Sequence, residues 1–187
     1  MNNPRKFPDP LSISLHWLVA LGILGLLIIG YYMTWNQVWS LYHWHKSLGI
    51  LLLVAIVIRS GWRLLQGWPA ADASHSPLER RLARLTQWLL LISSLLMPLT
   101  GMLYSGASGH GFALFGLHLV PDNPHPDIEW EVIPYSQHLS DLGQTAHELV
   151  SYLLCLALLM HLAGALKHHF IDRDNTLRAM LRPGDRR

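Results

Sequence analysis

Four long apolar stretches, separated by polar connections, dominate the pattern of hydrophobic and polar positions along the chain. The first, residues 11–33, contains no Asp, Glu, Lys or Arg in 23 positions. Because an α-helix rises about 1.5 Å per residue, this stretch is long enough to cross a hydrocarbon layer of about 30 Å. Its length, and the lack of a small-residue cleavage pattern after it, favour a retained membrane anchor over a signal peptide.

Three further stretches predict membrane spans of the same character. They cover residues 45–65, 85–104 and 146–167. The third of the four spans contains Pro98 and Gly101, which predict a kink that packing against neighbouring helices tolerates. No internal repeat is visible. The pattern predicts an all-α transmembrane four-helix bundle in which residues 1–187 form a single integral-membrane domain.

The composition supports a membrane protein. Hydrophobic residues make up 51% of the chain and charged residues only 14%, whereas soluble proteins carry about 25% charged residues. The single cysteine, Cys155, excludes an intrachain disulfide and a CxxC motif. The twelve histidines equal the twelve acidic residues in number, and this excess of imidazole is the feature that points to chemistry.

Basic residues predict the orientation, because cytoplasmic flanks of membrane spans retain Lys and Arg. Thirteen of the 14 fall on one side: Arg5, Lys6, Arg59, Arg63, Arg80, Arg81, Arg84, Lys167, Arg173, Arg178, Arg182, Arg186 and Arg187. Only Lys46 falls on the other side. Both termini are therefore expected in the cytoplasm of a bacterium, and the protein in its inner membrane. Near the span ends, an aromatic belt is predicted from Trp35, Trp39, Trp44, Trp62 and Trp68.

The connection between the third and fourth spans, residues 105–145, is expected in the periplasm. It carries five acidic residues and no Lys or Arg. Prolines at positions 121, 124, 126 and 134 argue against a long regular element there. The apolar segment 111–120 is expected to lie on the membrane surface.

Four histidines fall inside the predicted spans at two depths. His16 and His161 lie towards the cytoplasm, whereas His45 and His147 lie towards the periplasm. The 14 residues between His147 and His161 advance about 21 Å along a helix and return the side chain to roughly the same face. The spacing predicts that His16 faces His161 and that His45 faces His147.

Two imidazoles at one level of a helical bundle suit the axial positions of a haem iron. A single membrane histidine is as compatible with hydrogen-bonded packing as with ligation, and the two matched layers favour ligation. Structural zinc needs four close ligands, but each layer supplies only two histidines and no nearby cysteine. Covalent haem attachment needs a CxxCH motif, which the sequence lacks. We therefore predict two haems b. Glycines 22, 25, 30, 49 and 164 could let a flat macrocycle approach, although small residues also serve helix packing.

The other histidines are assigned different roles. His43 is predicted to point to another helix face from His45 and to lie at the interface. Solvated side chains in connections are expected for His75, His110, His118, His125 and His138, with copper or zinc binding as the alternative for those in the periplasm. His168 and His169 suit the dipole at the end of the fourth helix. The candidates to contact haem propionates are Lys46 near the periplasm and Arg59, Arg63, Lys167, His168 or His169 near the cytoplasm.

Several short motifs resemble the bacterial cytochrome b561 family, over nearly the whole chain. They are Ser14-Leu15-His16-Trp17, His45-Lys46-Ser47-Leu48-Gly49, Met160-His161, Leu166-Lys167-His168-His169-Phe170-Ile171-Asp172, and Phe115-Gly116 before Pro121. The resemblance implies a four-helix membrane cytochrome with two haems b whose ligands fall on His16, His45, His147 and His161. It also implies electron exchange with ubiquinone or another quinone, and superoxide oxidation at the periplasmic face in the best-described activity. The acidic connection does not suit that activity, because a positively charged surface would be needed to steer the superoxide anion to the protein.

The predicted function is electron transfer across the bilayer, between a periplasmic donor and the quinone pool. The donor is superoxide or a redox partner protein, so the chain is either an oxidoreductase or an electron-transfer protein. The alternative is a non-enzymatic cytochrome b anchor or relay subunit of a membrane dehydrogenase or hydrogenase. A transporter or another haem-free bundle has less support, because no pair of broken helices is evident. Lipid surrounds the chain, and no nucleic-acid partner is expected.

Overall fold

The computed structural model describes residues 9–67 and 76–181, apart from the side chain of Thr176. Some sequence predictions concern residues outside these ranges. They are those for Arg5, Lys6, Trp68, His75, Arg182, Arg186 and Arg187.

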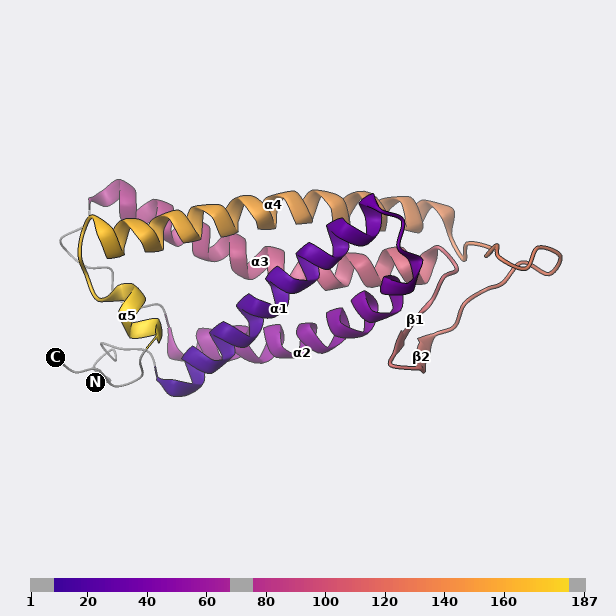
Figure 1. The fold of residues 1–187 in the computed structure, drawn as a ribbon, viewed down its shortest axis with the longest axis horizontal. Helices are drawn as coiled ribbons and strands as arrows, with labels where there is room; N and C mark the ends of the chain where they lie inside the picture. The colour runs from indigo at the N-terminus through magenta and orange to yellow at the C-terminus, as the bar shows by residue number, and fades with distance from the viewer. Residues whose placement is uncertain (1–8, 68–75, 182–187) are drawn as a thin grey trace.

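Four long helices form an elongated bundle (Figure 1). They are α1 (Pro10–Trp35), α2 (Tyr42–Gln66), α3 (Pro77–Ala107) and α4 (Gln137–Phe170). The shorter elements are the 3-10 turn η1 (Trp39–Leu41), the strands β1 (Phe112–Leu114) and β2 (Leu117–Val120), and the helix α5 (Thr176–Leu181). Each long helix is long and apolar enough to cross a membrane, and the predicted all-α transmembrane four-helix bundle is confirmed.

Capping residues place some helix ends beyond the predicted spans. Asp9 caps α1 by accepting from the Ser12 backbone N–H at 3.0 Å. Ser76 and Glu79 form a capping box at the start of α3, which therefore begins well before residue 85. Such caps satisfy the free N–H groups of the first helical turn, and the length of the apolar stretch alone does not locate them.

An antiparallel hairpin, which the sequence did not predict, occupies most of segment 111–120. Strands β1 and β2 pair next to the start of α2. The Ser47 hydroxyl donates to the Ala113 carbonyl and accepts from the Phe115 N–H, both at 3.0 Å. This side chain fastens the hairpin to α2. The proline-rich segment after β2 has one isolated bridge, between Pro124 and Val132, in keeping with the prediction of no long regular element.

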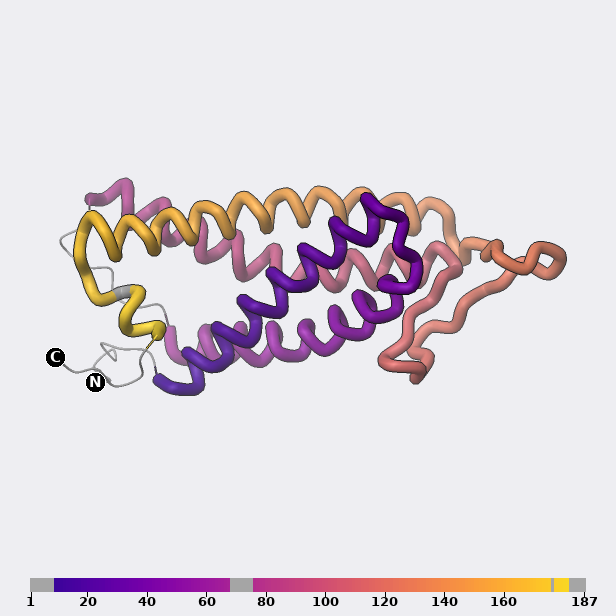
Figure 2. Tube along the Cα trace, viewed as in Figure 1, coloured from indigo at the N-terminus to yellow at the C-terminus, as the bar shows by residue number. Residues whose placement is uncertain are grey.

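The two ends of the bundle differ in what covers them. We call them the hairpin end, where β1 and β2 lie, and the α5 end (Figures 1 and 2). Trp17 at the α5 end donates from Nε1 to the carbonyl of Met180 at 2.8 Å, so α5 is held against α1. Trp62 donates to the Ser12 hydroxyl at 3.1 Å and joins α2 to α1 there.

Few residues are buried, as expected for helices surrounded by lipid. Within the most apolar window of each long helix, between 11% and 22% of the residues are buried. The main core cluster consists of Val19, Ile23, Ile56 and Leu154. Large apolar side chains elsewhere on the helices face outwards, where hydrocarbon would cover them.

Helices α3 and α4 lie side by side along most of their length (Figure 2). They approach closely at Gly143, where an added Cβ would lie 2.5 Å from the backbone nitrogen of Tyr104. Only glycine lets the two backbones come this near.

We predict that Gly143→Ala destabilises the protein by about 1–3 kcal/mol, because the methyl group would force α3 and α4 apart. Thermal unfolding of the purified protein in detergent measures the effect. Gly61→Ala is the matched control, because no atom lies within 4 Å of its added Cβ. Equal stability of the two variants would contradict the close packing at Gly143.

Candidate functional site

The structure brings together both predicted histidine pairs. At the hairpin end, the ring centroids of His45 and His147 lie 6.4 Å apart, with an angle of 82° between the ring planes. At the α5 end, the centroids of His16 and His161 lie 6.2 Å apart, with an angle of 62°. We call these the hairpin-end pair and the α5-end pair. Each pair joins two helices that are not consecutive in sequence.

The hairpin-end pair is held from α3. Nδ1 of His147 donates to the carbonyl of Met97 at 2.9 Å and lies 3.2 Å from the Thr100 hydroxyl. Because a carbonyl only accepts, the proton of His147 is on Nδ1, and Nε2 keeps a lone pair. Nδ1 of His45 is buried and has no hydrogen-bond partner among the described residues.

The α5-end pair has a different neighbour. The guanidinium of Arg59 donates from Nη2 to Nδ1 of His16 at 3.3 Å. Because arginine only donates, Nδ1 of His16 accepts, and the ring proton is on Nε2 in this arrangement. His16 and His147 therefore adopt opposite tautomers.

The ring separations suit a metal ion between two imidazoles. A metal–imidazole bond of about 2 Å, plus about 1 Å from the nitrogen to the ring centroid, gives roughly 6 Å for two opposed rings. A narrow cavity lined by His45, Gly49 and His147 lies at the hairpin-end pair. Together with the unpartnered Nδ1 of His45, these features fit two axial imidazole ligands of a haem iron.

The glycines expected to admit a macrocycle differ in their surroundings. A Cβ at Gly25, Gly49 or Gly164 would have no neighbour within 4 Å. A Cβ at Gly22 would lie 2.6 Å from Leu52, so this glycine serves helix packing. Gly30 packs against His45.

A cavity of about 530 Å³ opens beneath the hairpin, next to the start of α2. Its walls are largely aromatic, and its charged or titratable side chains are His43, Lys46, His110, His118 and Asp122. His43 thus lies outside the two pairs, as predicted. Lys46 donates to the carbonyls of Gly111 at 3.0 Å and His110 at 3.5 Å.

The electrostatics of this cavity do not favour anions. Burial and the positive charge of Lys46 lower the pKa of His110, although Asp122 opposes the shift. His110 is therefore neutral at pH 7 and adds no positive charge. Asp122 contributes a negative one.

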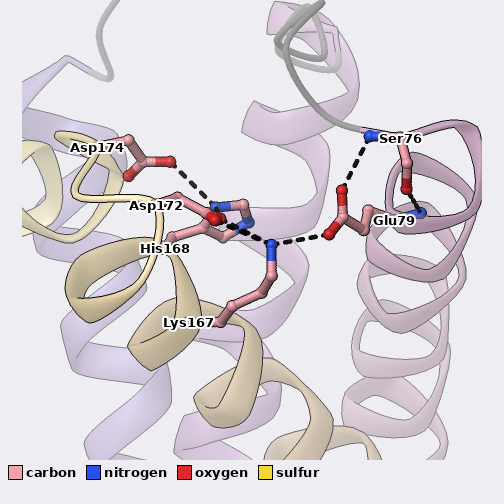
Figure 3. Close-up of polar contacts among 6 residues, drawn as sticks. All are labelled: Ser76, Glu79, Lys167, His168, Asp172 and Asp174. Carbon is pink, nitrogen blue, oxygen red and sulfur yellow. Dashed lines mark hydrogen bonds and ion pairs between the residues drawn. The ribbon is translucent and has the colours of Figure 1, made fainter.

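An ion-pair network lies at the α5 end (Figure 3). Lys167 of α4 pairs with Glu79 of α3 at 2.8 Å and with Asp172 at 2.9 Å. Nδ1 of His168 lies 3.0 Å from both Asp172 and Asp174. The network joins the end of α4 to the start of α3 and stabilises the turn towards α5.

The same network contains a trio with metal-binding geometry. The potential ligand atoms of His168, Asp172 and Asp174 lie within 4.8 Å of one another. Lys167 already supplies a positive charge to Asp172. In residues 9–67 and 76–181 this is the only such trio.

Sequence reasoning found the four histidines but missed the groups that orient them. The Met97 carbonyl belongs to an ordinary apolar residue, and no residue type signals such a contact. Thr100 is a polar residue in an apolar span, and this is the only hint in the sequence that a polar group contacts His147. The sequence makes Arg59 a candidate to contact haem propionates, and does not predict its contact with His16.

Comparisons with known proteins add independent findings. The profile of the family described as prokaryotic cytochrome b561 matches residues 9–183. Cytochrome b561 homolog 2 of Escherichia coli (strain K12) is 32% identical over 185 residues, covering 96% of this chain and 93% of that protein. Probable superoxide oxidase CybB of Yersinia pestis is 26% identical over 175 residues, covering 91% and 93%.

A third relative, Cytochrome b561 homolog 1 of Escherichia coli (strain K12), is 25% identical over 175 residues, covering 91% of this chain and 94% of that protein. The matches extend over nearly the full length of both partners, so they concern the whole bundle. The resemblance seen in the sequence motifs is confirmed. The chain belongs to the prokaryotic cytochrome b561 family of membrane proteins, which bind haem b and transfer electrons.

Proposed function

We propose that the protein holds two haems b and transfers electrons across the bilayer, between a donor at the hairpin end and the quinone pool. The observation that carries the proposal is the presence of two imidazole pairs at opposite ends of the bundle, with centroids 6.4 Å and 6.2 Å apart. His45 and His147 would ligate one haem, and His16 and His161 the other. When bound, the haems supply one-electron transfer.

At the hairpin end, the hydrogen bonds of the chain prepare one ligand. The Met97 carbonyl keeps the proton of His147 on Nδ1, which leaves Nε2 for iron. A ligand imidazole whose other nitrogen donates to a carbonyl is fixed in orientation and becomes a stronger electron donor.

At the α5 end, ligation through Nε2 of His16 requires the ring proton to move to Nδ1. Arg59 would then leave Nδ1, because two donors cannot share a hydrogen bond. The released guanidinium suits a carboxylate such as a haem propionate. His169, whose Nδ1 is buried and unpartnered among the described residues, is a second candidate for that role.

The distribution of charge supports an inner-membrane protein with the hairpin end in the periplasm. Described basic residues gather at the α5 end, whereas the described loop from 108 to 136 has no Lys or Arg. Insertion keeps basic flanks in the cytoplasm, so both termini would lie there.

Superoxide is one candidate donor, because a relative is named probable superoxide oxidase. Two superoxide anions would each release one electron and leave as dioxygen. One quinone would take up both electrons and two protons to form a quinol. The hairpin end gives this anion little electrostatic guidance, since Lys46 donates to backbone carbonyls and His110 is neutral at pH 7.

A redox partner protein is the second candidate donor, which would make the chain a relay subunit of a dehydrogenase or hydrogenase. The observation that favours it is an exposed apolar surface on the acidic loop. Trp130 is 84% exposed and Ile128 is 40% exposed. Exposed aromatic residues of this kind are common in protein interfaces.

We predict that His45→Ala and His147→Ala each remove the haem at the hairpin end, whereas His16→Ala and His161→Ala each remove the other. Loss of one axial ligand leaves the iron with a single protein bond. Haem-to-protein ratio and low-temperature absorption spectra measure the outcome, and His43→Ala, next to the site, should keep both haems. Equal loss of both haems from every ligand variant, in samples that remain monodisperse, would contradict the assignment.

Labelling of single cysteines tests the orientation. With Cys155 replaced by Ala, Trp130→Cys should react with a membrane-impermeant maleimide added to intact spheroplasts. Ile171→Cys, at the α5 end and 72% exposed, should react only after the membrane is permeabilised. The reverse pattern would invert the proposed topology.

Stopped-flow mixing of the oxidised holoprotein with superoxide tests the donor. We expect rapid haem reduction, followed by reoxidation when ubiquinone is added, with no reduction when superoxide dismutase is present. A haem that superoxide leaves oxidised, in a protein that co-purifies with a dehydrogenase, would replace the superoxide proposal with the relay subunit.

A further inference from the structure

Two glycines lie directly against the rings of the hairpin-end pair. A Cβ added to Gly101 of α3 would lie 3.0 Å from Cε1 and 3.1 Å from Nδ1 of His147. A Cβ added to Gly30 of α1 would lie 3.2 Å from Cε1 of His45. Each imidazole is therefore in contact with the backbone of a neighbouring helix, at a position that has no side chain.

Backbone conformation does not require glycine at either position. Positive φ angles occur at other glycines, such as Gly67 and Gly116, but not at Gly30 or Gly101. A glycine inside a helix costs roughly 1 kcal/mol relative to alanine. At both positions, the nearest atoms that an added methyl group would meet belong to an imidazole ring. The missing side chain therefore leaves room for that ring.

The two contacts act on rings that cross at 82°. The His147 ring is held by the Met97 carbonyl at 2.9 Å on α3 and lies against Gly101, four residues further along the same helix. The His45 ring has no hydrogen bond at Nδ1 among the described residues, and Gly30 of α1 lies against its Cε1. The α5-end pair has no counterpart, since no described glycine has His16 or His161 among the nearest neighbours of its added Cβ.

We propose that Gly30 and Gly101 are positioning residues, which fix the nearly perpendicular arrangement of the two axial imidazoles at the hairpin end. The inference rests on the proposed function, because it takes His45 and His147 as iron ligands. Gly101 is the stricter of the two. Its partner ring is also fixed by a hydrogen bond and cannot turn away without breaking it, whereas Nδ1 of the His45 ring has no hydrogen bond to break among the described residues.

The proposal has a spectroscopic consequence. In a low-spin ferric haem, the angle between the axial ring planes determines the anisotropy of the electron paramagnetic resonance signal, and nearly perpendicular planes give a strongly anisotropic one. Orientation of the axial ligands also contributes to the reduction potential. A methyl group at either glycine should therefore change the hairpin-end signal and leave the α5-end signal as it is.

The test compares Gly101→Ala, Gly30→Ala and Gly61→Ala in purified, oxidised holoprotein. Gly61 is the control, because it is exposed on α2 and its added Cβ has no neighbour within 4 Å. We expect Gly101→Ala to shift the hairpin-end signal strongly or to abolish it, and Gly30→Ala to shift it less. A redox titration should show the hairpin-end equilibrium displaced by up to about tenfold in Gly101→Ala, which is 59 mV for one electron.

Three outcomes decide the proposal. A changed hairpin-end signal beside an intact α5-end signal supports it, and the intact signal shows that the bundle has folded. Wild-type signals in both Gly30→Ala and Gly101→Ala overturn it. If Gly101→Ala fails to fold, Gly30→Ala decides alone, and a wild-type signal there overturns the proposal.

His45→Ala and His147→Ala, measured in parallel, separate this inference from the proposed function. If they keep the hairpin-end haem signal, the ligand assignment itself is wrong. If they lose it while both glycine variants remain like wild type, only the positioning role is wrong.

Discussion

The structure depends on one constraint, which is the cost of placing an imidazole ring in hydrocarbon. A polar group without a partner in lipid costs several kcal/mol, and the four membrane histidines lie in two pairs. Ring centroids 6.4 Å and 6.2 Å apart leave the rings too far apart for a direct hydrogen bond between opposed nitrogens, and at the separation that a shared metal ion requires. Under the proposed function, an iron between the two rings of each pair would meet this constraint.

Packing between α3 and α4 explains why His147 is oriented so well. The two helices run antiparallel (Figure 1), and their backbones approach closely where Gly143 meets Tyr104. One turn further along α4 lies His147, and one turn back along α3 lies Thr100, so the two residues face each other. The Met97 carbonyl then falls within 2.9 Å of Nδ1. A small residue at one level thus helps to set the hydrogen bond of His147 at the next.

Helical spans and pairing of the histidines could be predicted from the sequence, because both follow from fixed periodicities. Uncharged stretches give the spans, and the 14-residue spacing of His147 and His161 places two rings on one face. Groups that act through the backbone could not be predicted. The Met97 carbonyl carries no sequence signal. The hairpin is held by Ser47, which belongs to a helix far from it in sequence. The contact of Arg59 with His16 depends on a rotamer and on the crossing of α1 over α2, which periodicity does not determine.

The residues between the two pairs complete the physical picture. Leu154 is seven positions from both His147 and His161, and is 1% exposed. It packs with Val19, Ile23 and Ile56, and none of the side chains in this cluster is polar. Protons need a chain of polar groups or water to cross such a layer, whereas electrons tunnel through packed apolar atoms. An apolar cluster between the two histidine pairs therefore suits the proposed transfer of electrons from one end of the bundle to the other.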